Sequence, residues 1–365
     1  MTSYRINGSC RIILFLLLGC IGGIATGEAL AASIHLTIPK AGAYTGAYIE
    51  FGDTEDNVTA EAISNFESLV GKHLAIVAFS SYWGERSFPS AQLNTVTAKG
   101  AVPLIFWSPW DHPYEEVHPE EQRFPHNPIN LHVILAGKFD DYIDRWADAA
   151  KAYGRPMLVA WGLEMNGQWF PWSGIFHGAG KHVPGQQGYL GPETYKRAYR
   201  YVVDRVRARG ATGIAWVFQS NGYSIPRAPW NRVAEYYPGP DYVDWLGMSA
   251  YGKQFANEQW ASPAEAMDHP YQEITSVDAT KPVILAEWGV GEFPKSGSKA
   301  QYVHDALELI TSRYSRIRAA VFWHEHWQNE DGSFSDLRIN SSQGAVEEYR
   351  RGIAKPFWID RPAFN

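Results

Sequence analysis

The sequence predicts a single (β/α)8 barrel, an α/β fold in which eight parallel strands alternate with helices. Short apolar runs of strand length alternate with longer segments of helix length after the first 31 residues. No linker, repeat or low-complexity segment divides this region, and barrels of this size are commonly single domains. We therefore expect one domain over residues 32–365, with an active-site groove at the C-terminal ends of the strands, where such barrels carry their function.

Eight apolar runs are predicted as the strands of this barrel. In chain order they cover residues 43–51, 73–80, 102–107, 157–163, 214–219, 243–250, 283–286 and 317–323. Helices are predicted at residues 60–70, 90–99, 138–153, 192–209, 300–315 and 343–353, with at most a short helix between 221 and 240. The helix from 192 is the clearest, because Pro192 and Glu193 open it and Gly210 closes it.

Two long segments are predicted as loops over the barrel mouth. Residues 111–135 are rich in Pro, His and Glu without periodicity, and residues 173–191 are rich in Gly. The four histidines of the first loop have no tight ligand spacing and do not predict a metal site: His112, His118, His126 and His132.

Composition places the chain among globular proteins that do not bind nucleic acid. Of the 365 residues, 45% are apolar and 19% charged, and the net charge is -7, so a basic face is not expected. The 15 Trp and 20 Tyr residues favour a long aromatic groove that takes a polysaccharide, although an aromatic-rich core would also use them. A monomer is expected.

The first 31 residues have the pattern of a secretory signal peptide. Arg5 and Arg11 precede an apolar run that is too short for a comfortable membrane span, and small residues follow. We expect a secreted or periplasmic protein; the alternative is a lipid anchor at Cys20, whose neighbours resemble a lipoprotein cleavage box. Because Cys10 and Cys20 are the only cysteines, no disulfide is expected after residue 31.

The stretch from residue 157 to 172, MLVAWGLEMNGQWFPW, joins a buried strand to polar and aromatic residues. Five apolar residues precede Glu164 and Asn166, so a carboxylate is expected at the strand's exit. Trp169 and Trp172 follow, and aromatic rings are surfaces on which apolar sugar faces stack. The pattern predicts a carboxylate beside sugar-binding rings; the alternative is a buried, paired glutamate in an aromatic core.

A second carboxylate, Glu287, follows the predicted seventh strand and would face Glu164 across the barrel mouth. Two carboxylates there indicate glycoside hydrolysis. In a retaining mechanism they lie about 5 to 5.5 Å apart, one protonating the leaving group while the other attacks the anomeric carbon. Tyr251 is expected to hydrogen-bond Glu287, and Trp323 and Trp107 to contact sugar, although packing at the barrel rim would equally explain these rings.

Residues 164–172, EMNGQWFPW, resemble the acid/base motif of glycoside hydrolase family 26. Further segments resemble the family in the same order: residues 191–193, 216–218, 236–239, 244–247, 281–289 and 322–323. The resemblance implies a retaining (β/α)8 hydrolase with Glu164 as acid/base, Glu287 as nucleophile and Tyr251 as its partner. It also implies that Trp169 and Trp323 contact sugar, and that no cofactor is needed.

Two positions depart from the family's pattern. Leu163 stands where the family usually has His, and Ser249 where an acidic residue is common. Neither change removes a catalytic carboxylate, so we expect the reaction to be kept and the contacts to the bound sugar to differ.

The substrate and the function class stay open between alternatives. The family implies β-1,4-mannan first, then mixed-linkage β-1,3-1,4-glucan, a bacterial exopolysaccharide or β-1,3-xylan. A non-catalytic glycan-binding barrel is a second class, suggested by the two departures. A metal-dependent hydrolase using His324, Glu325 and His326 is a third, because imidazole and carboxylate are reasonable zinc ligands.

Overall fold

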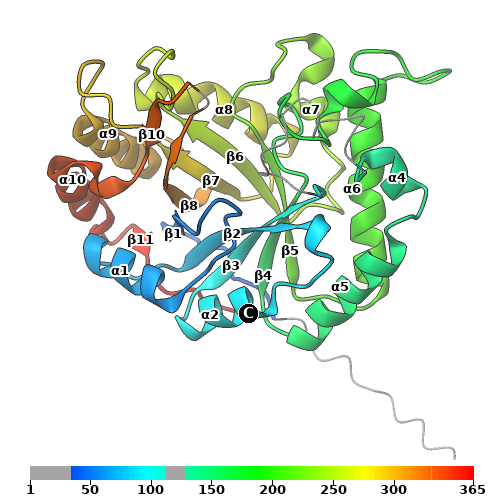
Figure 1. The fold of residues 1–365 in the computed structure, drawn as a ribbon, viewed down its shortest axis with the longest axis horizontal. Helices are drawn as coiled ribbons and strands as arrows, with labels where there is room; N and C mark the ends of the chain where they lie inside the picture. The colour runs from blue at the N-terminus through cyan, green and yellow to red at the C-terminus, as the bar shows by residue number, and fades with distance from the viewer. Residues whose placement is uncertain (1–33, 112–127, 330) are drawn as a thin grey trace, which may run out of the picture. The chain divides into compact units, whose positions relative to one another are not determined.

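The structure is a computed structural model that describes residues 34–111, 128–329 and 331–365. Eight parallel strands pair in chain order, and β1 also pairs with β8, which closes the barrel (Figure 1). The strands are β1 (Ala43–Ile49), β2 (Ile76–Tyr82), β3 (Val102–Ser108), β4 (Met157–Trp161), β5 (Ile214–Ser220), β6 (Trp245–Tyr251), β7 (Val283–Gly289) and β8 (Ile317–His324). The predicted fold class is confirmed.

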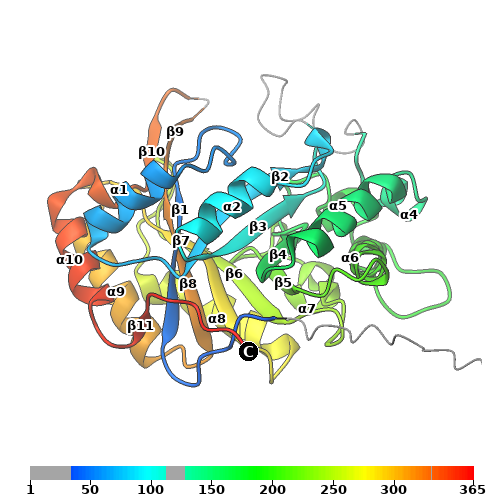
Figure 2. The same ribbon diagram turned by 90° about the horizontal axis from the view of Figure 1, so that it is seen from below.

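Helices lie around the outside of the barrel, as the two views in Figures 1 and 2 show. They are α1 (Ala60–Val70), α2 (Ser90–Ala98), α4 (Leu131–Leu135), α5 (Asp140–Tyr153), α6 (Leu190–Ala208), α7 (Val233–Tyr236), α8 (Pro263–Val277), α9 (Lys299–Ser312) and α10 (Gln343–Ile353). Nearly every residue of the eight strands is buried, because the strands face the barrel interior on one side and helices on the other. This burial explains why the strands are continuous apolar runs in the sequence.

The structure differs from the predicted elements at two places that matter for the site. Strand β7 extends to Gly289, so Glu287 lies within the strand rather than after it. Helix α8 was not predicted, although Ser262, Pro263 and Glu265 form a helix start: the Ser262 and Glu265 side chains each accept from the other's backbone N–H.

Three short strands were also not predicted. Strands β9 (His326–Gln328) and β10 (Phe334–Asp336) form an antiparallel pair that follows β8, and β11 (Trp358–Ile359) pairs with β1. Figure 2 shows the β9–β10 pair projecting from the barrel. Among the described residues, no helix has both the length and the apolarity to cross a membrane.

Candidate active site

One cavity of about 1390 Å³ contains both predicted catalytic carboxylates. Its lining includes Glu164 and Glu287 together with Trp169, Tyr251 and Trp323, so five of the predicted site residues meet there. This volume exceeds the roughly 300 to 1,000 Å³ of a typical pocket for one small ligand. The cavity is therefore large enough for more than one sugar ring.

Glu164 is held by the turn that follows β4. Its φ is 53°, a left-handed conformation that is uncommon for a residue with a side chain and that concentrates at functional sites. The Glu164 backbone N–H donates to the Gln219 carbonyl at 2.9 Å, which ties this turn to β5. The Trp169 Nε1–H donates to Glu164 Oε2 at 2.9 Å. Gly167 makes this possible, because a Cβ there would lie only 2.5 Å from the Trp169 ring.

Glu287 is held by donors from two neighbouring strands. The Tyr251 hydroxyl at the end of β6 donates to Glu287 Oε2 at 2.8 Å. The Gln219 Nε2–H of β5 donates to Glu287 Oε1 at 2.8 Å. With one donor on each oxygen, the carboxylate is fixed in orientation and its charged form is favoured by both contacts.

Ser249 connects the two carboxylates. The Gln219 Nε2–H that reaches Glu287 also donates to Ser249 Oγ at 3.1 Å. The Ser249 hydroxyl in turn hydrogen-bonds Glu164. Gln219 and Ser249 are both almost completely buried, so this path from Glu287 to Glu164 runs through side chains rather than through bulk solvent. Sequence reasoning missed Gln219; its position at the end of a predicted strand, pointing to the barrel mouth, was the available signal.

Burial raises the pKa of both carboxyls. Loss of solvent raises the pKa of Glu164, against the hydrogen bonds from Ser249 and Trp169, which lower it. The pKa of Glu287 is raised well above its usual range by burial and then by the charge of Glu164. Two neighbouring carboxyls cannot both ionise easily, so the pair retains a proton at a pH where isolated glutamates have lost theirs.

Trp323 lies in the same cavity, supported from behind by Tyr48 and Glu325. The Trp323 and Tyr48 rings are stacked with centroids 4.0 Å apart and planes 14° apart. Glu325 Oε2 accepts from Trp323 Nε1 at 2.8 Å, and Glu325 Oε1 accepts from the Tyr48 hydroxyl at 3.2 Å. Burial, followed by the charge of Glu55, raises the pKa of Glu325 to about 8. Sequence reasoning assigned Glu325 only to a metal alternative and missed this supporting role.

Trp107 and Trp172 were predicted to contact sugar, and the structure corrects both predictions. Trp107 is fully buried, stacks on Trp146 at 4.0 Å and donates its Nε1–H to the Tyr142 hydroxyl at 3.0 Å. Trp172 is 1% exposed and donates its Nε1–H to the Leu163 carbonyl at 2.6 Å. Each ring is fixed in the core by its neighbours, so neither presents a face to the cavity.

Asn166 was also predicted to bind substrate, and it does not line the cavity either. Its side chain is completely buried. Nδ2 donates to the Asn221 carbonyl at 3.1 Å, and Oδ1 accepts from the Asn221 backbone N–H at 2.9 Å. Asn166 therefore joins the loops after β4 and β5, which positions Glu164 indirectly.

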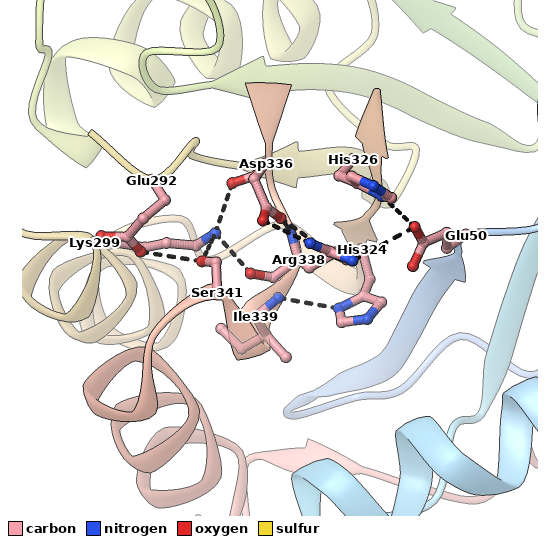
Figure 3. Close-up of polar contacts among 9 residues, drawn as sticks. All are labelled: Glu50, Glu292, Lys299, His324, His326, Asp336, Arg338, Ile339 and Ser341. Carbon is pink, nitrogen blue, oxygen red and sulfur yellow. Dashed lines mark hydrogen bonds and ion pairs between the residues drawn. The ribbon is translucent and has the colours of Figure 1, made fainter. Parts of the chain in front are cut away.

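Of the residues of the metal alternative, His324 and His326 point to different partners (Figure 3). His324 is buried, and its Nδ1 accepts from the Ile339 backbone N–H at 3.0 Å. His326 pairs with Glu50, while Glu325 holds Trp323 and Tyr48. Among the residues that the structure describes, no group of three or more His, Cys, Asp or Glu side chains is arranged to hold a metal ion. This arrangement does not support a metal-dependent hydrolase that uses His324, Glu325 and His326.

Several predictions fall on residues outside the described part of the chain. These are the signal peptide over residues 1–31, Cys10, Cys20, His112, His118 and His126. His132 is described; its ring lies on α4, 5.2 Å from the ring of His177.

Known proteins resemble this chain in sequence and in fold. Endoglucanase H of Acetivibrio thermocellus is 30% identical over 346 residues, which cover 94% of this chain and 33% of that protein. Beta-1,3-xylanase TXYA of a Vibrio species is 30% identical over 247 residues, 62% of this chain and 49% of that protein. The chain thus spans between a third and a half of the length of these curated relatives.

A solved endo-beta-1,4-mannanase from Cellulomonas fimi has the same fold, with a TM-score of 0.59 at 17% identity, covering 87% of this chain and 72% of that one. The sequence profile described as Glycosyl hydrolase family 26 matches residues 128–313, about half of the chain, a range that includes Glu164 and Glu287. The chain belongs to glycosyl hydrolase family 26.

Proposed function

We propose that the protein is a retaining endo-β-glycanase, which hydrolyses a β-linked polysaccharide by double displacement. The observation that carries this proposal is the pair Glu164 and Glu287 in one cavity, joined through Ser249 and Gln219. Action within a chain, rather than at its end, is supported by the size of the cavity, which exceeds that of a pocket for one small ligand.

In the first step, protonated Glu164 transfers its proton to the glycosidic oxygen as the bond from that oxygen to the anomeric carbon breaks. The Glu287 carboxylate attacks the same carbon, which forms a covalent glycosyl-enzyme. Burial raises the pKa of the Glu164 carboxyl, which favours the protonated form that this step requires. The donors Tyr251 and Gln219 keep Glu287 oriented for attack.

In the second step, Glu164, now a carboxylate, removes a proton from a water molecule. The water oxygen attacks the anomeric carbon, the bond to Glu287 breaks, and both carboxyls return to their initial states. Trp323 and Trp169 border this reaction centre, and their rings would stack against the apolar faces of the sugars on either side of the broken bond.

Two classes of substrate compete for this site. β-1,4-Mannan is the substrate that the family resemblance implies first. β-Glucan is the second candidate, favoured by a specific observation: Endoglucanase H aligns with 94% of the chain at 30% identity. Leu163 is consistent with the second candidate, because it cannot give a sugar hydroxyl the hydrogen bond that a histidine would.

A reducing-sugar assay on mannan, glucomannan, mixed-linkage β-glucan and β-1,3-xylan tests this proposal. We expect the wild type to cleave at least one polymer and Glu287→Ala to lose this activity by about 10⁴-fold or more, because the nucleophile is removed. Glu347→Ala, at an exposed glutamate on α10 that does not line the cavity, is the matched control for folding and is expected to stay active. Added azide should restore turnover to Glu287→Ala, with a glycosyl azide of inverted configuration as product.

The same assay separates an enzyme from a non-catalytic glycan-binding barrel. A wild type that binds one of these polymers but cleaves none of them would support the binding barrel. Azide rescue of Glu164→Ala with an inverted product would instead reverse the assignment of the two carboxylates.

A further inference from the structure

A hairpin arm contributes an aromatic ring to the lining of the cavity. The arm is the pair of strands β9 (His326–Gln328) and β10 (Phe334–Asp336), which projects from the barrel after β8 (Figure 2). Trp327 of β9 and Phe255 of the loop after β6 both line the cavity that contains Glu164 and Glu287. Hydrogen bonds to Glu164 and Glu287 come from Trp169, Tyr251 and Gln219, so the reaction described above uses neither of the two rings.

The base of the arm is fastened to the barrel, as Figure 3 shows. The buried Lys299 Nζ donates to the Asp336 carbonyl at 3.1 Å and to the Arg338 carbonyl at 2.7 Å. The Glu292 backbone N–H also donates to the Asp336 carbonyl, at 3.0 Å. On the β9 side, His326 pairs with Glu50 at the end of β1. These contacts hold both strands of the arm at their base.

The Trp327 ring is fixed in place by a chain of hydrogen bonds. Its Nε1–H donates to Asn329 Oδ1 at 3.0 Å, and Asn329 Nδ2 donates to Ser335 Oγ at 3.0 Å. Ser335 Oγ donates to the Gln254 carbonyl at 2.8 Å, which links the arm to the loop after β6. The indole N–H is thus already used, and what Trp327 has left to offer a ligand is its apolar ring.

The two rings meet at a steep angle. Trp327 and Phe255 have centroids 6.2 Å apart and planes 68° apart, so they form an apolar corner. Phe255 is 38% exposed, so part of its ring is accessible to a ligand. The corner is continuous with the catalytic cavity, and Gln254 and Gln328 beside it supply amide groups that suit sugar hydroxyls.

We propose that Trp327 and Phe255 form a distal sugar-binding subsite, which takes a further neutral sugar ring of the polysaccharide chain that the catalytic carboxylates cleave. This subsite rests on the proposed function and adds to it a preference for longer chains. Because Trp327 would bind a sugar remote from the broken bond, it would stabilise the bound substrate and the transition state by the same binding free energy.

The experiment compares hydrolysis of β-1,4-manno-oligosaccharides and mixed-linkage β-gluco-oligosaccharides, from trisaccharides to hexasaccharides. For Trp327→Ala, kcat/KM on the hexasaccharide should fall about tenfold through a higher KM, the order expected for the loss of an aromatic anchor. The trisaccharide, which fills fewer binding positions along the cavity than the hexasaccharide does, should be cleaved as by the wild type. Trp327→Phe, which keeps a ring, should recover most of the loss.

Phe334→Ala is the matched control, because Phe334 lies on the same arm and is 58% exposed but does not line the cavity. It should leave both substrates unaffected. An equal loss on trisaccharide and hexasaccharide, or no loss on either, would overturn the subsite while leaving the catalytic proposal intact.

If the wild type cleaves neither series and none of the polymers in the reducing-sugar assay, the proposed function fails. Calorimetric titration with the two hexasaccharides then decides about the subsite. Weaker binding by Trp327→Ala than by the wild type would support the distal subsite. Equal binding, or no binding by either protein, would overturn it.

Discussion

Ser249 links Gln219 to Glu164, because its hydroxyl accepts from Gln219 and hydrogen-bonds Glu164. A third acidic side chain at this position would add a negative charge beside two carboxyls whose pKa values burial already raises. The serine thus keeps the network connected without this repulsion. Leu163 borders a smaller cavity that Glu164 also lines, and it adds only an apolar surface there.

Glu325 gives a prediction about pH. Its pKa is raised to about 8 in the folded protein, whereas an unfolded glutamate has a pKa of about 4.5, so between these values the folded state holds the additional proton. This contribution to stability is present below about pH 4.5 and is lost as the pH rises to about 8. In Glu325→Gln, the free energy of unfolding should therefore decline less steeply with pH in this range. The slopes of the variant and the wild type should differ by up to about 1.4 kcal/mol per pH unit.

Urea unfolding of the wild type and Glu325→Gln between pH 5 and pH 8 measures this difference in slope. Glu347→Gln is the matched control, because this exposed glutamate contacts Gln343 on α10, away from the site. Parallel stability curves for the wild type and Glu325→Gln would contradict the raised pKa.

At the scale of residues, the sequence predicted which side chains face the cavity where this depends on their position along a strand. That Glu164, Glu287 and Tyr251 meet in one cavity could be predicted, because polar residues near the C-terminal ends of barrel strands face the mouth. The sequence did not distinguish Trp107 and Trp172, which are buried in the core, from Trp323, which lines the cavity. Whether an aromatic ring faces a cavity or a neighbouring ring depends on residues distant in the chain, such as Trp146 for Trp107.

At the scale of elements, one buried lysine makes several of the contacts that hold the base of the hairpin arm. Lys299 is 2% exposed and donates to Asp336, Arg338 and Ser341. Lys299→Met keeps the length of the side chain but leaves the Arg338 carbonyl without this donor. We expect a loss of about 1 to 3 kcal/mol in the free energy of unfolding, the usual cost of an unsatisfied buried polar group.

Denaturation in urea measures this loss. Lys295→Met provides the control, because Lys295 is exposed in the segment that precedes α9. A stability of Lys299→Met within about 0.5 kcal/mol of the wild type would show that the lysine does not fasten the arm.

The elements themselves could be predicted to different degrees. Helices α1 and α10 begin and end at the predicted residues, because capping side chains mark their starts and apolar residues recur at helical spacing. Helix α8 was missed although Ser262, Pro263 and Glu265 mark its start, and Pro270 inside it weakens the helical pattern. The hairpin arm could not be predicted, because each strand has only three residues and its stability comes from contacts with α9 and the loop after β6.

At the scale of the whole molecule, closure of the barrel brings together residues that the chain keeps far apart. Glu164 follows β4, Glu287 lies in β7, and their link runs through β5 and β6. The eight-strand alternation predicted that these ends would meet, since all strands of a closed parallel barrel end on one face. The continuity of this face with the hairpin arm was visible only in three dimensions.

The most direct test of the account is the configuration of the sugar released at the start of the reaction. Proton NMR, recorded during the first minutes of hydrolysis of a hexasaccharide that the wild type cleaves, distinguishes the two anomers before they interconvert. Double displacement through Glu287 predicts that the β-anomer forms first, because two inversions restore the original configuration. The α-anomer as first product would show a single displacement by water and would contradict the role of Glu287 as nucleophile.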